Sequence, residues 1–470
     1  MQYTFTEPNE QLTFTESSDY LMIPCTLQGF HNTETTTHKS VSGRDIFLFR
    51  GTLDECPDDR KCPVCGSRMH VHAHNNVTLR HLPFGSNLSS VLIPRIQFQC
   101  SECRFTKSQT ISFKADGHLI TEELCNYVRD LLASGHYTNK AVAELAGLGK
   151  NVVKEIDKQR LLDKYTVDGK CLRKPEKTTR FIGIDEFKLH NGRRYATHII
   201  DMENGHILWI GHGKKKQIVY DFIEHVGMEW MSHVEAIACD MNSDFQEAFE
   251  DTCEWVQPVF DHFHIVKNFN DKVVTEVRRD EQRRLYESGD RKGARALKRT
   301  KYILTSSRDT LQRKDREAAE GKVLSKGSDL FNKEEVVRKS GYESKYDELL
   351  KENELLFTLD LIKEKLDEAY KQTQEPVMAD MIMEIIDICR STKNKHLCWF
   401  ARLLDTHFEG IIAHAAFRIS SGKIEGINNK IKTIRRQGYG YPDDEYFFLK
   451  IIDSTRNTYV RNPASHKIND

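Results

Sequence analysis

The sequence lacks the long apolar segments that membrane proteins carry. A helix that crosses a membrane needs about 18 consecutive apolar residues, and no run in the chain reaches that length. The first residues, MQYTFTEPNEQL, also lack the basic and apolar stretches of a secretory signal. We therefore expect a cytoplasmic protein without a membrane partner. In that compartment the twelve cysteines are not expected to form disulfides, so close cysteine pairs become candidate metal ligands.

The whole chain has almost no net charge, but one segment of it is strongly basic. The formal charge is -1, from 69 Lys and Arg against 70 Asp and Glu, and this average argues weakly against a nucleic-acid partner. Residues 418–436, however, hold six basic residues and one acid, Glu425. Because a phosphate backbone is bound by local positive charge, this segment is a candidate DNA-binding region.

Proline is scarce, with 11 residues in the chain, and it is nearly absent from the highly charged stretch 263–400. The apolar spacing of that stretch is helical, whereas residues 178–262 alternate strand and helix patterns. The length of 470 residues suggests about three domains. We divide the chain into an N-terminal segment of unknown role (1–45), a cysteine-containing β region (46–115), a short-helix region (116–170), an α/β region (178–262), a helical insertion (263–400), a second part of the α/β region with a basic helix (401–456) and a tail (457–470).

Two cysteine pairs have the spacing of a zinc ribbon. Cys62 and Cys65 lie in CPVCG, and Cys100 and Cys103 lie in CSEC. Each pair can bind one ion through two thiolates, and four thiolates complete the closed tetrahedral sphere of a structural zinc. Four unrelated buried thiols are the alternative, and a redox pair is disfavoured because no thioredoxin-like pattern surrounds either pair. We predict one structural Zn²⁺, without which this ribbon should not fold.

The segment after the ribbon has the pattern of a helix-turn-helix. Thr138 or Asn139 can cap a short helix that ends at Ala146, residues 147–149 form the turn, and residues 150–158 form a second, recognition helix. A three-helix packing module without a ligand is the alternative. The exposed polar residues of the second helix are candidate DNA contacts: Lys150, Asn151, Lys154 and Lys158.

Two aspartates end predicted strands of the α/β region. Strands are expected at 181–187, 195–202, 206–213, 234–240 and 255–261, and Pro258 suggests an edge or end position for the last. Asp185 ends the first strand and Asp240 ends the fourth. In a sheet ordered as in ribonuclease H these strands are neighbours, so the two carboxylates would lie side by side. Like charges 4 Å apart repel by about 4 kcal/mol at an effective dielectric of 20, so the pair requires a proton or a cation.

The chemistry of paired carboxylates favours a hard divalent cation. Oxygen ligands favour Mg²⁺ or Mn²⁺ over Zn²⁺. Two such ions can activate the attacking oxygen and stabilise the leaving oxygen of a phosphoryl transfer. Glu186 follows Asp185 in the same strand and is expected to point to the opposite face, so Asp185 is the better candidate ligand.

A third carboxylate is expected from the basic helix SGKIEGINNKIKTIRRQGYG. Its isoleucines recur at helical spacing and form a stripe toward the core: Ile424, Ile427, Ile431 and Ile434. Glu425 lies on another face, where an acid followed by amides and basic groups suits a metal ligand beside DNA. A surface helix with a Glu–Lys pattern is the alternative, and Asp443, Asp444 and Glu445 are rival third acids. The candidate DNA contacts of this helix are Asn428, Asn429, Lys432, Arg435 and Arg436.

Four motifs taken together resemble a known family. FIGIDEF, CDMNSDF, FDHFH and SSGKIEGINNKIKTIRRQGYGY are similar to the DDE transposases of bacterial insertion sequences, in particular the ISL-three family, over about residues 45–455. The resemblance implies a multidomain α/β protein. Its RNase H-like mixed-sheet catalytic core would be interrupted by an all-helical insertion and preceded by a zinc ribbon and a helix-turn-helix. In that core Asp185, Asp240 and Glu425 would bind two Mg²⁺ or Mn²⁺ ions.

The resemblance also implies an activity and its partners. The enzyme would recognise terminal inverted repeats, cleave the transposon ends and join the freed 3′-hydroxyls to target DNA, as a homodimer or a larger synaptic assembly. Asp261 and His264 match the FDHFH motif, and they either support the metal site or DNA, or serve as a helix cap and a packed histidine. A metal-dependent DNA nuclease without strand transfer and a transposase-derived DNA-binding regulator remain alternatives.

Overall fold

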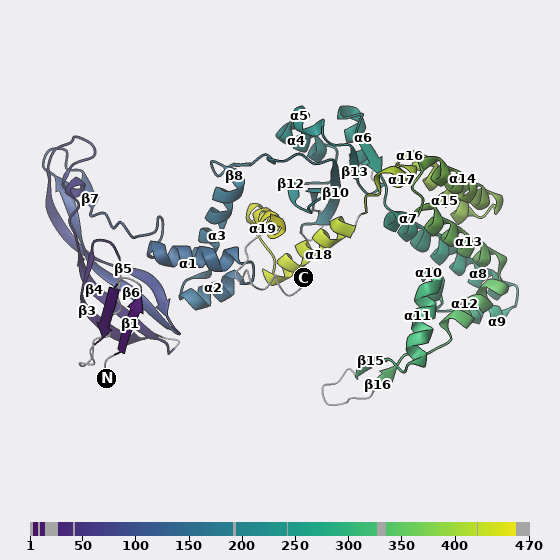
Figure 1. The fold of residues 1–470 in the computed structure, drawn as a ribbon, viewed down its shortest axis with the longest axis horizontal. Helices are drawn as coiled ribbons and strands as arrows, with labels where there is room; N and C mark the ends of the chain where they lie inside the picture. Colours follow the sequence, from purple (N-terminus) through teal and green to yellow (C-terminus); the bar gives the residue numbers. More distant parts are fainter. Residues whose placement is uncertain are drawn as a thin grey trace. The chain divides into compact units, whose positions relative to one another are not determined.

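The computed structural model describes residues 3–7, 10–14, 27–40, 43–190, 194–241, 243–326, 335–420 and 422–456. The chain forms two compact units, drawn in Figure 1. Unit 1 comprises residues 1–173 and 433–470, and unit 2 comprises residues 174–432. The predicted tail, 457–470, lies outside the described residues. No helix in the described ranges is long and apolar enough to cross a membrane.

Unit 1 begins with β-structure. Its main sheet has the order β3-β4-β6-β5, with the short strand β7 paired to β6, and β4 and β6 run parallel while the other pairs are antiparallel. The sheet begins at Phe30, before the predicted boundary at residue 46, because the polar Thr-rich stretch forms its first strand. The strands and the single 3-10 turn are β1 (Tyr3–Glu7), β2 (Glu10–Phe14), β3 (Phe30–Lys39), β4 (Asp45–Leu53), η1 (Pro57–Arg60), β5 (Met69–Phe84), β6 (Asn87–Cys100) and β7 (Thr106–Ser108).

Three helices follow in unit 1: α1 (Glu122–Ala133), α2 (Asn139–Ala146) and α3 (Lys150–Tyr165). Thr138 caps α2 by accepting a hydrogen bond from the Ala141 N–H, and Gly147 ends it with φ +65°. The predicted boundaries of α2 and the start of α3 are therefore correct, but α3 extends well past Lys158. The remaining elements of the unit are β8 (Thr166–Val167), β9 (Cys171–Leu172) and α19 (Asp444–Arg456), and α19 packs against α3.

Unit 2 contains a five-stranded mixed sheet with the order β12-β11-β10-β13-β14. The strands β10, β11 and β12 form an antiparallel meander, whereas β13 and β14 run parallel to β10. All five predicted strands are present, and the Pro258 strand lies at the edge as expected. Their bounds are β10 (Phe181–Lys188), β11 (Tyr195–Asp201), β12 (Ile207–His212), β13 (Ala236–Ala238) and β14 (Gln257–Val259).

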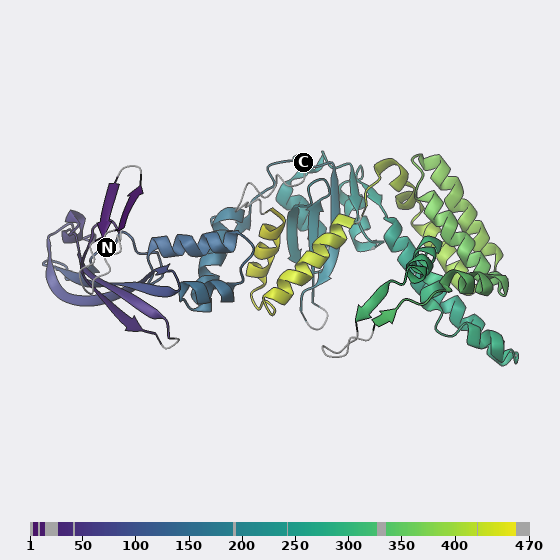
Figure 2. The same cartoon turned by 60° about the horizontal axis from the view of Figure 1, so that its bottom comes forward.

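Helices cover both faces of this sheet. A Cβ at Gly211 would lie 2.4 Å from the Ile218 side chain of α4, so that helix packs closely on one face. A Cβ at Gly183 would lie 2.8 Å from Ile424 of α18, which crosses the opposite face (Figure 2). Gly183 and Asp185 are two residues apart on β10 and so face the same side of the sheet. Gly211 is paired through Thr197 with Glu186, which faces the other side. The helices are α4 (Gln217–Val226), α5 (Met228–Met231), α6 (Ser243–Thr252) and α18 (Gly422–Gln437).

The insertion is mostly helical, with α13, α14 and α15 stacked side by side (Figure 1). The prediction of an all-helical insertion is wrong, because β15 (Val323–Lys326) and β16 (Glu335–Val337) form a hairpin within it. The helices of this region are α7 (His262–Asn268), the π-helical turn η2 (Phe269–Val274), α8 (Thr275–Glu287), α9 (Arg291–Ala296), α10 (Lys301–Thr305), α11 (Arg308–Ala319), α12 (Tyr342–Lys351), α13 (Glu354–Ala369), α14 (Glu375–Ser391), α15 (Lys395–Thr406), α16 (Phe408–Ile412) and α17 (His414–Phe417).

Candidate functional site

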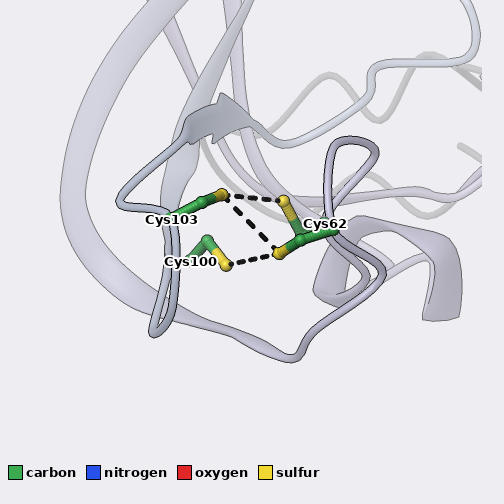
Figure 3. A group of neighbouring side chains, drawn as sticks. Cys62, Cys100 and Cys103 are labelled. Atoms are coloured by element: carbon green, nitrogen blue, oxygen red, sulfur yellow. Dashed lines mark hydrogen bonds between the residues drawn. The ribbon is translucent and has the colours of Figure 1, made fainter.

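The four predicted cysteines meet in unit 1. Their sulfur atoms are separated by 3.5 Å between Cys62 and Cys103, 3.4 Å between Cys65 and Cys100, and 3.6 Å between Cys65 and Cys103. Figure 3 shows the labelled side chains of Cys62, Cys100 and Cys103 turned toward a common centre. A zinc ion bound at about 2.3 Å by four thiolates requires sulfur separations of about 3.8 Å. The arrangement therefore fits a tetrahedral zinc after a small expansion.

Local backbone geometry builds the first cysteine pair. Gly66 has φ +74°, a conformation that glycine adopts without strain, and its N–H donates to the Cys62 carbonyl at 2.9 Å. Hydrogen bonds from the Ser67 hydroxyl and backbone N–H lower the pKa of Cys65 to about 6. A thiolate is the form that binds zinc, so the turn also prepares the ligand chemically.

Asp185 and Asp240 come from neighbouring strands of unit 2, but Asp185 lies within β10, which continues to Lys188 instead of ending at the aspartate as predicted, and Asp240 follows β13 by two residues. Gly183 of β10 pairs with Ala238 of β13 in parallel register, and each aspartate follows two residues after its paired residue. Both aspartates therefore lie at the same end of this strand pair. Their carboxylates also accept backbone N–H groups of the following residue, at 2.8 Å for Asp185 and 2.7 Å for Asp240.

His264 of α7 is in contact with the second aspartate. Its Nδ1 lies 3.2 Å from Asp240 Oδ1. Burial alone would raise the pKa of Asp240, but the hydrogen bond and positive charge of His264 hold it below its ordinary value. The same hydrogen bond raises the pKa of His264, with further contributions from the charges of Asp240 and Asp185. Asp261 occupies the N-cap position of α7 without a side-chain capping hydrogen bond.

Glu425 lies in the first turn of α18, on the face of the sheet that carries Asp185. Lys423 anchors this turn by donating to the carbonyls of Met202 and Glu203, at 2.6 and 2.5 Å. Glu425 itself is exposed. Among the described residues, the four cysteines are the one group in which three or more possible metal-ligand atoms lie within 4.8 Å of one another. The three carboxylates are thus not gathered that tightly here.

Asn428, predicted as a DNA contact, lies against the first aspartate instead. Its Nδ2 donates to Asp185 Oδ2 at 2.6 Å, and its Oδ1 lies 3.0 Å from Nε2 of His198. His198 is fully buried and was not among the predicted site residues. The signal that could have identified it is the strand register, because His198 of β11 pairs directly with Asp185 of β10.

The neighbouring acid Glu186 lies on the other face, as expected. Its Oε1 is 3.6 Å from Lys214 Nζ. Burial raises its pKa, and its Oε2 is buried without a hydrogen-bond partner in the part of the chain that is described. Glu186 is therefore separated from Asp185 by the sheet itself.

The predicted DNA contacts of α3 differ in accessibility. Lys150 and Asn151 are exposed at its N-terminus. Lys154 lies 2.8 Å from Asp443, and Lys158 lies 2.6 Å from Glu445. These ion pairs occupy two of the rival third acids as well as two of the predicted DNA contacts. On α18, Asn429, Lys432 and Arg436 are exposed and Arg435 is half-buried.

Two family models match the chain. A model described as a transposase of the ISL3 DDE type matches residues 182–451, which is more than half of the chain. A second, described as the zinc-finger of the transposases of IS204, IS1001, IS1096 and IS1165, matches residues 58–103. The first range covers the sheet of unit 2, its insertion and α18, and the second covers the cysteine site.

Similar curated proteins carry the same description. The transposase for insertion sequence element IS1001 of Bordetella parapertussis is 28% identical over 393 residues, covering 83% of this chain and 87% of that protein. The transposase for IS1557 of Mycobacterium tuberculosis, from strains CDC 1551 / Oshkosh and ATCC 25618 / H37Rv, is 24% identical over 267 residues, covering 56% of this chain and 57% of that protein.

The sheet with its paired aspartates and the cysteine site thus belong to a transposase that carries a structural zinc ribbon. More particularly, the chain belongs to the ISL3 family of DDE transposases of insertion sequences. The family resemblance predicted from the four sequence motifs is confirmed.

Proposed function

We propose that this transposase cleaves the ends of its insertion sequence and joins the freed 3′-hydroxyls to target DNA at a site formed by Asp185, Asp240 and Glu425. The observation that carries the proposal is the position of the two aspartates, each two residues beyond the last paired residues, Gly183 and Ala238, of the parallel strands β10 and β13. The helix that bears Glu425 packs on the face of the sheet that carries Asp185, at Gly183. Three acids from two strands and one helix would then surround the reacting phosphate.

The order of the strands supports an RNase H-like core. Numbered along the chain, the five strands have the spatial order 3-2-1-4-5, with the first three antiparallel and the last two parallel to the first. That order makes the first and fourth strands neighbours, as expected for such a core. The insertion then separates the second aspartate from the glutamate along the chain.

The donor set suits two Mg²⁺ or Mn²⁺ ions, because carboxylate oxygens are the ligands that these ions prefer. Asp185, Asp240 and Glu425 would hold them. When bound, such ions activate the attacking oxygen and stabilise the leaving oxygen of an in-line displacement. The chain's own part is to fix the carboxylates: Asn428 donates to Asp185, and His264 lies against Asp240.

DNA binding is proposed for two helical surfaces. In unit 1, α2, the Gly147 turn and α3 have the arrangement of a helix-turn-helix, and Lys150 and Asn151 are exposed where a recognition helix enters the groove. In α18, the candidate phosphate contacts are Asn429, Lys432, Arg435 and Arg436. Two transposon ends must be brought together, so we expect a dimer or a larger assembly on DNA.

Substitution of each acid tests this assignment. Asp185→Asn, Asp240→Asn and Glu425→Gln should each abolish Mg²⁺-dependent cleavage of end DNA while leaving its binding in a gel-shift assay intact. Glu186→Gln is the matched control, because Glu186 follows Asp185 but lies on the opposite face. Cleavage at the unmodified rate by any of the three variants would remove that residue from the active site.

A further inference from the structure

We propose that His198 is a positioning residue of the active site, which acts through Asn428 to hold Asp185 and α18 in place. The inference rests on the proposed function, because it assigns a role beside the same carboxylate. It is carried by a chain of two hydrogen bonds. His198 Nε2 lies 3.0 Å from Asn428 Oδ1, and Asn428 Nδ2 lies 2.6 Å from Asp185 Oδ2.

The chemistry of the three groups fixes the direction of this chain. A carboxylate only accepts, so the Asn428 amide must turn its NH₂ group toward Asp185. Its carbonyl oxygen then faces His198, which must donate from Nε2. In the reverse orientation, the Asn428 oxygen would face the Asp185 carboxylate, so that two acceptors meet. Its NH₂ group would face the Nε2–H of His198, so that two donors meet. His198 therefore selects the one orientation of Asn428 that can hold the carboxylate.

The surroundings of His198 keep its ring in that state. The side chain is fully buried, and the ring stacks on Phe187 with centroids 6.0 Å apart. Its Nδ1 is buried without a hydrogen-bond partner in the described part of the chain. A proton on Nδ1 would be a buried donor without an acceptor, which is costly. The ring is thus neutral, with its single proton on Nε2, and burial correspondingly lowers its pKa.

The link connects three elements of the site. His198 is in β11, Asp185 is in β10, and Asn428 is in α18, three residues after Glu425. Residues three apart on a helix are neighbours along its surface. Fixing Asn428 on Asp185 therefore also fixes the helical turn that carries Glu425. Without it, Asp185 would keep only the N–H of Glu186 as a described hydrogen-bond donor.

Manganese binding without DNA tests the proposal independently of catalysis. His198→Leu removes the donor at similar volume, and Asn428→Ala removes the amide. Groups that orient metal ligands typically contribute 10–100-fold to metal affinity, so each variant should raise the Mn²⁺ dissociation constant by about that factor in calorimetry or Mn²⁺ electron paramagnetic resonance. His198→Gln, whose side-chain NH₂ can replace the Nε2 donor, should recover most of the affinity.

Three further measurements separate positioning from general destabilisation. His225→Leu is the matched control, because His225 also packs on an aromatic ring, that of Trp209 at 4.7 Å, but comes from α4 on the opposite face. It should leave Mn²⁺ affinity unchanged. The double variant of His198→Leu with Asn428→Ala should bind no more weakly than the worse single variant, since both break one chain. The Mg²⁺ concentration for half-maximal cleavage should rise in parallel.

The outcomes distinguish this inference from the proposed function. If Asp185→Asn abolishes Mn²⁺ binding but Asn428→Ala and His198→Leu leave it unchanged, the positioning role is overturned and the metal site remains. Additive losses in the double variant would also overturn it. If Asp185→Asn leaves Mn²⁺ binding unchanged, the proposed function itself fails. Asn428 is only half-buried, so its alanine variant keeps the test available if His198→Leu does not fold.

Discussion

At the scale of single residues, the value of a basic side chain depends on what already neutralises it. Lys432 is exposed on α18, whereas Lys158 lies within 3.2 Å of Asp443 and 2.6 Å of Glu445. A lysine that neutralises a DNA phosphate releases a counterion, and one already paired with acids releases none. The two lysines therefore form a matched pair for measuring phosphate contacts.

We predict that Lys432→Ala weakens DNA binding mildly and uniformly across sequences. The slope of log K against log salt concentration should become shallower by about one. Lys158→Ala is the control and should leave the slope unchanged. Fluorescence anisotropy with end DNA and with random DNA, over a range of salt concentrations, measures both. An unchanged slope for Lys432→Ala would show that this lysine does not contact a phosphate.

The candidate acids were predictable from sequence because each lies at a recognisable point of a local pattern. Asp185 and Asp240 each follow a short apolar run, and Glu425 lies beside an isoleucine stripe at helical spacing. The residues that contact the predicted site residues were harder to predict from the sequence. His198 is identified by strand register, and the acids that pair with Lys154 and Lys158 lie nearly 290 residues away in the chain. Single-sequence patterns carry no such pairing information.

At the scale of elements, α3 and α19 are joined by a buried ionic network. Asp157 is fully buried and accepts from Arg160 at 2.8 Å, Tyr446 at 2.6 Å and Lys450 at 2.9 Å. Burial alone would raise the pKa of Asp157, but the charges of Lys450 and Arg160 hold it below its ordinary value. Asp157 therefore joins α3 to α19 together with a second buried carboxylate, Asp453 of α19, which accepts from Arg160, Lys164 and Tyr165.

We predict that Asp157→Ala destabilises unit 1 by about 3–5 kcal/mol, because it leaves buried cations without their counter-charge. Asp163→Ala, an exposed site on the same helix, should change the free energy of unfolding by less than about 0.5 kcal/mol. Urea unfolding, followed by the backbone circular dichroism signal, measures the free energy of unfolding of both variants. Equal effects of the two substitutions would contradict the network's role.

The same carboxylate predicts a pH dependence. A carboxyl whose pKa is lower in the folded than in the unfolded state stabilises the fold above the unfolded pKa, and this stabilisation is lost as the pH falls through the folded value. With an ordinary pKa of 3.8 for Asp157, its contribution should be complete above about pH 5 and decline below it. The difference in unfolding free energy between the protein and Asp157→Ala should therefore shrink on acidification. A difference that is constant down to pH 2 would be the contrary result.

Elements were predictable where their patterns are strong. In unit 2, three strands follow one another in short succession and two more are separated by helices, and all five were predicted as strands. Among the strands that were not predicted, two kinds show why. The short strands β15 and β16 lie in charged helical surroundings, and β3 is a polar Thr-rich stretch without an apolar stripe. Threonine suits a half-buried strand, but β3 lacks the alternation of apolar and polar residues by which a strand is recognised in a sequence.

At the scale of the whole molecule, the zinc site belongs to one of two compact units. The cysteine cluster and its core are in unit 1, whereas the large apolar core that runs from the sheet into the insertion is in unit 2. Zinc binding contributes about 10–16 kcal/mol in small modules. Loss of the ion should therefore act on unit 1 much more than on unit 2.

We predict about one zinc per chain by elemental analysis, and two transitions in differential scanning calorimetry. A chelator, or Cys65→Ser, should lower the transition of unit 1 and leave that of unit 2 in place. The Asp157→Ala shift should fall on the same transition as the chelator effect. A folded protein without zinc would refute the ribbon assignment, and an equal shift of both transitions would contradict the independence of the units.

The insertion between the second aspartate and α18 has a consequence for synthesis of the enzyme. Asp185 and Glu425 are separated by 240 residues (425 − 185 = 240). A ribosome that adds about 5–20 residues per second needs roughly 12–48 s to make that stretch. During this interval the strands and the insertion can fold while the last acid is still missing. If Glu425 is the third acid, as proposed, an incomplete or prematurely terminated chain cannot cut DNA, and cleavage activity is withheld until translation is nearly finished.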